Sequence, residues 1–149
     1  MSEEDIKELL ATGSIRRVPR DHHTALQELE AARQHVRAAE MIQEIDPTLA
    51  FTAFYDAMRK SISAHMRSNG YRVGKGPGAH TKTVAYARAA LDQLEIEETL
   101  EEFDALRLLR NQGEYEALFI DPNETKQARE HARLLVTAVT DDLQGSATP

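Results

Sequence analysis

Apolar residues recur at spacings of three and four along most of the chain, which is the repeat of an amphipathic α-helix. The cleanest of these stripes runs from Ala128 to Leu143, near the end of the sequence. No alternating pattern of a β-strand and no internal repeat is visible. The chain is therefore predicted to form an all-α, up-and-down bundle of about five helices with short connections.

Capping residues set the expected limits of these helices. Asp46-Pro47 and Asp121-Pro122 each combine an Asp N-cap with Pro at the first helical position. Asp21, Thr81 and Thr99 are the other expected N-caps, and Thr99 also fits a capping box. The segments that connect the helices are therefore expected just before these capping residues.

The chain, residues 1–149, is predicted to be a single domain. Residues 1–20 are expected to hold a short helix and an irregular lead-in, and residues 146–149 a flexible tail. Gly70 suits a left-handed C-cap, and a long glycine-rich loop is expected over residues 71–80.

The composition narrows the class of protein. Cysteine is absent, which excludes disulfides and thiolate metal sites, and no recognisable metal-binding motif occurs, so neither a metal nor a cofactor is expected. No apolar run has the length of a membrane span, and the acidic N-terminus lacks the features of a signal peptide. A cytoplasmic location is therefore expected. The net charge of −7 argues against strong non-specific binding of nucleic acid.

Charge is nevertheless segregated along the chain. From Ala57 to Leu91 there is no acidic residue, and from Asp92 to Asp104 there is no basic one. The basic residues of the first stretch are Arg59, Lys60, Arg67, Arg72, Lys75, Lys82 and Arg88. Two interpretations stay open: a basic surface for an anionic partner, or two solvated helix faces of opposite sign.

One predicted helix carries a line of polar side chains suited to an anion. At 100° per residue these side chains fall within an arc of about 140°. A separate arc of about 80° holds the positions of a core face, which are Leu106, Leu109, Gly113, Ala117 and Ile120. The polar line consists of Arg107, Arg110, Asn111, Glu114 and Tyr115. It is rich in long donors, which suits a phosphate, but an ordinary wet surface would look similar. Leu108 and Phe119 beside the line suggest that a second subunit covers it.

Several short segments occur in a particular order along the chain: Phe54-Tyr55-Asp56-Ala57, Gly70-Tyr71, Gly78-Ala79-His80, Arg110-Asn111 and the helix after Asp121-Pro122. In this order they resemble the HEPN family, and the resemblance extends from about Ala25 to Leu143. HEPN domains are all-α bundles that are usually dimeric. Many are metal-independent ribonucleases that act as toxins, defence effectors or RNA-processing enzymes, and others are non-catalytic companions of small nucleotidyltransferases.

The resemblance implies that Arg110, Asn111 and Tyr115 form the catalytic set, and the chain departs from the family at one of these positions. The family motif ends in a His a few residues after the Arg, and this chain has Tyr115 there. A phenol with a pKa of about 10 is a poorer general base at neutral pH than an imidazole with a pKa of about 6.5. The resemblance therefore implies either an RNA- or nucleotide-interacting ribonuclease or a non-catalytic interaction module.

The glycine-rich loop supplies further candidates for binding an anion. Lys75, His80 and Lys82 lie in or beside it, and with Arg107 they are the expected RNA-binding residues. If the loop folds across the polar line, His80 could supply the imidazole that position 115 lacks. The alternative is that the loop is simply flexible. The partners expected from this reading are RNA or a nucleotide, a second copy of the chain, and a nucleotidyltransferase-type antitoxin, with no membrane.

Overall fold

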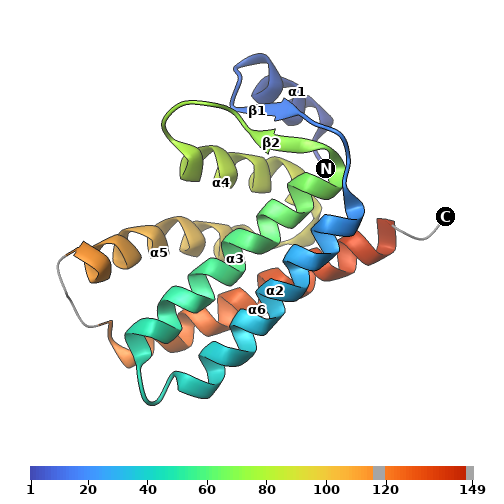
Figure 1. Ribbon diagram of the computed structural model, residues 1–149. Helices are drawn as coiled ribbons and strands as arrows, with labels where there is room; N and C mark the ends of the chain where they lie inside the picture. Colours follow the sequence, from blue (N-terminus) through green and yellow to red (C-terminus); the bar gives the residue numbers. More distant parts are fainter. Residues whose placement is uncertain (116–119, 147–149) are drawn as a thin grey trace.

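Six α-helices, one short 3-10 helix and a two-stranded ribbon make up the part of the chain that the structure describes (Figure 1). This computed structural model describes residues 1–115 and 120–146, and the side chains of residues 110–115 and 146 are not among the described ones. The elements are α1 (Glu3–Ala11), β1 (Ile15–Arg17), α2 (His22–Ile42), α3 (Pro47–Asn69), β2 (Tyr71–Val73), α4 (Ala79–Ala90), η1 (Asp92–Leu94), α5 (Glu97–Tyr115) and α6 (Pro122–Ser146). The predicted all-α helical fold is confirmed.

Helix α3 is the centre of the bundle. It packs against α2 and α6 along one side and against α4 and α5 on the other (Figure 1). Its apolar surface is correspondingly wide, and Phe51, Phe54, Met58 and Ile62 are all fully buried. Such a helix needs partners on two sides, because an apolar surface of that width cannot be covered by one neighbour.

Backbone geometry explains how α3 begins and ends. The Asp46 carboxylate accepts a hydrogen bond from the Leu49 N–H at 3.0 Å, and Pro47 stands at the start of the helix as predicted. Gly70 ends it with φ at 81°, in the left-handed region that favours glycine. A Cβ at Gly70 would lie 3.0 Å from both the Val18 carbonyl oxygen and the Arg20 Cγ, so the lead-in to α2 packs directly on this turn.

Two of the expected helix starts are wrong. Helix α4 begins at Ala79 rather than after Thr81, because Gly78 adopts φ of 84° and lets the chain enter the helix earlier. Helix α5 begins at Glu97, where two acidic residues complement the helix dipole in its first turn. Thr99 therefore lies inside α5, and its buried hydroxyl bonds to His131 Nδ1 at 3.0 Å.

The two-stranded ribbon was not expected from the sequence. Strand β1 comes from the predicted irregular lead-in and β2 from the predicted loop; they pair antiparallel, with Arg16 opposite Arg72. Each strand has only three residues, which is too short to show an alternating pattern, and the partner is remote in sequence. Gly74 closes the ribbon: a Cβ there would overlap the carbonyl oxygen of Gly13.

The expected flexible tail, residues 146–149, lies outside the described residues except for the backbone of Ser146, which is the last residue of α6. Over residues 1–115 and 120–146, no helix has the length and apolar character that crossing a bilayer requires.

Candidate functional site

A cleft of about 920 Å³ opens between α3, the β2 strand and the first turn of α4. Its wall also includes the segment that leads into α2, and Phe103 of α5. Four arginines line it, and they are Arg20, Arg59, Arg67 and Arg72. The volume is that of a typical small-molecule site, and the guanidinium groups suit an anionic ligand.

The arginines of the cleft are not equally engaged by carboxylates. Arg67 pairs with Glu28, and Arg59 lies 3.8 Å from Asp56. Arg20 and Arg72 have no acidic partner among the described residues. Asp21 also lines the cleft, but the four arginines still leave an excess of positive charge there, although the whole chain is acidic.

His80 is the expected site residue that the structure places in the wall of this cleft. Its Nδ1 lies 3.0 Å from the Tyr55 hydroxyl, and its Nε2 lies 3.2 Å from the Asp104 carboxylate. Phe103 packs against both rings, with centroids 5.3 Å from Tyr55 and 4.9 Å from His80. Three helices thus hold the imidazole, since Tyr55 belongs to α3, His80 to α4 and Asp104 to α5.

The surroundings of His80 favour its neutral form. Burial lowers the pKa of His80 below its ordinary value of 6.5; the Asp104 carboxylate opposes that effect, and the Arg107 guanidinium adds to it. Because a carboxylate only accepts hydrogen bonds, the proton of the neutral ring belongs on Nε2, facing Asp104. Nδ1 is then the acceptor, and the Tyr55 O–H donates to it. This arrangement makes Nδ1 a base that is already joined to a phenol.

The other expected anion-binding residues lie around the cleft rather than in its wall. Arg107 is exposed on α5 and reaches the site only through its electrostatic effect on His80. Lys75 is exposed in the loop, and Lys82 donates from Nζ to the Lys75 carbonyl oxygen at 3.1 Å. Lys82 therefore braces the loop, and the prediction that both lysines bind RNA directly stays a prediction.

The expected catalytic set cannot be placed at the level of side chains. Arg110, Asn111 and Tyr115 belong to α5, and their side chains lie outside the described residues. Helix α5 does carry Asp104, which contacts His80, and Arg107, which acts on it electrostatically, about two turns and one turn before Arg110. The backbone thus brings the polar line and the cleft onto one helix.

The sequence alone missed part of this site. The acid-free stretch pointed to Arg59, Arg67 and Arg72, but Arg20 comes from a segment that carried no signal. Tyr55 and Asp104 were not recognised as partners of His80, because they are 25 and 24 residues away along the chain.

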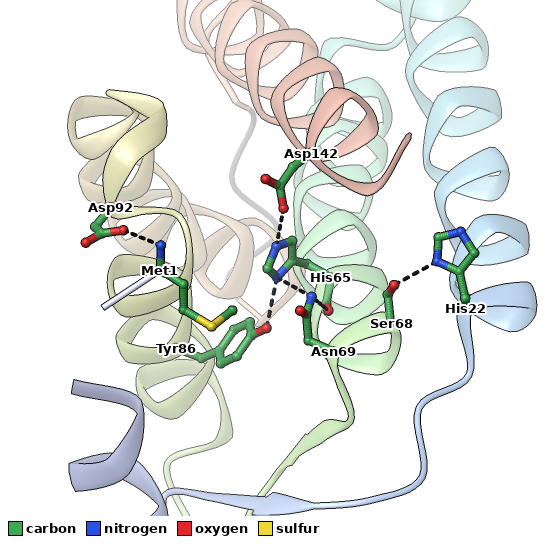
Figure 2. A network of polar contacts seen from close by, with 8 residues as sticks. All are labelled: Met1, His22, His65, Ser68, Asn69, Tyr86, Asp92 and Asp142. Carbon is green, nitrogen blue, oxygen red and sulfur yellow. Dashed lines mark hydrogen bonds and ion pairs between the residues drawn. The ribbon is translucent and has the colours of Figure 1, made fainter. Parts of the chain in front are cut away.

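A second polar network lies in the interior between α3, α4 and α6 (Figure 2). His65 is only 1% exposed; its Nδ1 lies 2.8 Å from the Tyr86 hydroxyl and its Nε2 2.7 Å from the Asp142 carboxylate. The hydrogen bond from His65 lowers the pKa of Asp142, while burial raises the pKa of Tyr86. Asn69 adds a bond from its side-chain amide to the His65 carbonyl oxygen at 2.9 Å. In this network, as around His80, a tyrosine hydroxyl lies at Nδ1 of the histidine and an aspartate carboxylate lies at Nε2.

Comparison of the chain with family models, with curated proteins and with solved structures finds no match. What can be inferred about the function therefore comes from the geometry of the two networks and of the cleft. Among the described residues, no group of three or more His, Asp or Glu side chains is placed to hold a metal ion.

Proposed function

We propose that this protein is a HEPN-like, RNA- or nucleotide-interacting protein that holds phosphate groups in the arginine-lined cleft. The observation that carries this proposal is His80, held by Asp104 and Tyr55 in the wall of a cleft that four arginines line. Guanidinium groups bind phosphate through paired hydrogen bonds, and a neutral imidazole is the usual general base at neutral pH. Together they match the needs of a phosphodiester substrate.

The reaction that suits these groups is metal-independent cleavage of RNA. The 2′-hydroxyl of the substrate takes the place of the Tyr55 hydroxyl at His80 Nδ1 and gives its proton to that nitrogen. The 2′-oxygen forms a bond to the adjacent phosphorus, the bond from phosphorus to the 5′-oxygen breaks, and Tyr115 gives a proton to the leaving 5′-oxygen. His80 thus replaces the histidine that the family motif has where this chain has Tyr115. Arg110 stabilises the charge of the pentavalent phosphorus, Asn111 orients the phosphate, and Tyr115 contacts it as a weak acid.

The biological setting that accompanies this function is a toxin–antitoxin or defence module in the cytoplasm. It comes from the HEPN resemblance, as does the proposal of a homodimer with a nucleotidyltransferase-type antitoxin as partner. One feature supports a partner surface on α5: Leu108 is 62% exposed next to the polar line.

A specific observation favours the second candidate, a non-catalytic interaction module. Both ring nitrogens of His80 already have partners, and Arg59 and Arg67 already lie against carboxylates. A site whose groups are satisfied internally can serve as a rigid binding face without taking part in chemistry. The cleft then forms part of an interface with a nucleotidyltransferase or another protein.

An assay on bulk RNA separates the two candidates. Purified wild type is compared with Arg110→Ala, His80→Ala and Tyr115→Phe, and Lys126→Gln serves as the control because Lys126 is an exposed charge on α6 outside the cleft. The ribonuclease predicts cleavage that Arg110→Ala and His80→Ala abolish and Lys126→Gln leaves intact. RNA binding without cleavage supports the non-catalytic module. If the wild-type protein neither binds nor cleaves RNA, the proposed function is overturned. Expression in cells adds a second readout, because a toxin arrests growth and Arg110→Ala relieves the arrest.

A further inference from the structure

The β1–β2 ribbon places two like charges directly opposite each other. In the antiparallel register Arg16 is the partner of Arg72, so their side chains leave the same face of the ribbon about 5 Å apart at Cβ. Ile15 is buried, and because side chains alternate along a strand, the face that carries Arg16 and Arg72 is the outer one. Both arginines are exposed. Like charges in this arrangement destabilise the pairing of the strands.

Nothing in the described part of the chain neutralises this pair. Neither Arg16 nor Arg72 takes part in an ion pair with a described carboxylate, and the ribbon is held instead by its backbone. The Gly74 N–H donates to the Ser14 carbonyl oxygen at 2.9 Å, and the Val18 N–H donates to the Gly70 carbonyl oxygen at 2.9 Å. The fold therefore keeps two unfavourably placed charges at a fixed separation.

The pair is continuous with the cleft. Arg72 lines the cleft and also stands next to Arg16 on the outer face, so it forms the rim between the two surfaces. Arg20 lines the cleft from the segment that follows β1, where its side chain lies against Gly70. A path of positive charge thus leads from Arg59 and Arg67 on α3, past Arg20 and Arg72, to Arg16 outside the cleft.

We infer that the ligand is a single-stranded RNA segment that extends from the cleft over the rim and across the outer face of the ribbon. This inference rests on the proposed function and narrows it, because a free nucleotide would fill the cleft without reaching Arg16. A duplex does not fit, since the cleft has the size of a site for a small molecule. The sugar–phosphate backbone of one strand supplies successive negative charges to the arginines along the path, independently of base sequence.

Binding of fluorescent oligouridylates of increasing length, with uridine monophosphate as the shortest ligand, tests the inference by anisotropy. Wild-type affinity should rise with length until the strand covers the ribbon. Arg16→Gln should weaken binding of the longer strands by about 3- to 10-fold and leave uridine monophosphate unaffected. It should also reduce the slope of log affinity against log salt concentration by about 0.7, the value for one phosphate contact on a single strand.

Lys126→Gln is the matched control, because it removes one exposed positive charge from α6, whose first residues lie at the end of the bundle away from the ribbon (Figure 1). It should change neither the affinity nor the salt slope. Circular dichroism of Arg16→Gln should show an intact fold, which assigns its weaker binding to the missing charge.

The possible outcomes separate this inference from the proposed function. If uridine monophosphate and the long strands bind equally well, or if Arg16→Gln and Lys126→Gln behave alike, the inference is overturned while the cleft remains a nucleotide site. If a duplex binds more tightly than a single strand of equal length, the inference is likewise overturned. If no nucleotide or RNA binds to the wild type, the proposed function fails first.

Discussion

The two Tyr–His–Asp networks have the same order of atoms but different surroundings. In both, a tyrosine hydroxyl meets Nδ1 of the histidine and an aspartate meets Nε2. The interior histidine is 1% exposed and its aspartate side chain 27%, against 11% and 54% for the histidine and aspartate at the cleft. The interior network joins α3, α4 and α6, and the cleft network joins α3, α4 and α5.

The same pattern of hydrogen bonds around a histidine can therefore occur in two different roles, and the pattern alone does not define a catalytic group. The interior network stabilises the fold because His65 and Tyr86 are buried and their polar groups would be costly to leave unpaired. The same network in the wall of a cleft keeps those restraints on the imidazole and adds access for a ligand. We therefore expect loss of stability from changes at His65 and loss of activity from changes at His80.

The largest effect is expected for His65→Ala. The substitution leaves the buried Tyr86 hydroxyl and the Asp142 carboxylate without their shared partner, at a cost of about 3 kcal/mol in the free energy of unfolding. Urea denaturation followed by circular dichroism measures this cost. His80→Ala is the comparison, with an expected cost of about 1 kcal/mol because water can reach the groups it exposes. Equal costs at the two positions would remove the distinction between the networks.

His80→Ala should affect catalytic activity much more strongly than it affects stability. If His80 receives the substrate proton, its loss lowers the rate of RNA cleavage by about 100-fold or more, whereas binding of RNA changes little. His23→Ala provides the control, because His23 is an exposed histidine outside the cleft. A rate for His80→Ala within a factor of two of the wild-type rate would exclude the imidazole from the reaction.

The tyrosines of the two networks should differ in the same way as the histidines, with smaller losses of stability. Tyr86→Phe removes the hydroxyl that faces His65 Nδ1 inside the protein, and we expect a loss of about 1 to 2 kcal/mol in the free energy of unfolding. Tyr55→Phe should cost less than half as much, since its oxygen lies at the wall of the cleft, where water can take its place. Thermal unfolding of the two variants, measured side by side, gives the difference. A larger loss for Tyr55→Phe would contradict the assignment of the structural role to the interior network.

The smallest effect concerns the pKa of His80, which two neighbours shift in opposite directions. Asp104 raises it and Arg107 lowers it, on top of the larger lowering by burial. Asp104→Asn should therefore move the pKa further below 6.5, and Arg107→Gln should move it back toward that value. NMR titration of the His80 ring measures both changes, and the acid limb of any cleavage activity should follow them. Shifts of the same sign in the two variants would rule out this electrostatic arrangement.

Helical periodicity and capping residues were sufficient to predict the bundle, because those signals are local. Asp46-Pro47 and Gly70 bound α3 as expected. The prediction of Thr81 as the N-cap of α4 was wrong because Gly78, with its positive φ, starts the helix earlier. This is an effect of backbone geometry rather than of the residue pattern. The ribbon and the partners of His80 depend on contacts between remote segments, for which one sequence carries no periodic signal. His80 itself was recognised as a candidate, but its geometry required the three-dimensional arrangement of α3, α4 and α5.

The close approach of Gly74 to Gly13 also bears on the order of folding. Helices α2 and α3 are neighbours in the chain and can associate through local contacts, whereas the ribbon must bring together segments on either side of that whole hairpin. Closure of so long a loop carries an entropic cost that is recovered only once the helices are in place. Refolding chains should therefore regain their helical signal before the two strands of the ribbon pair.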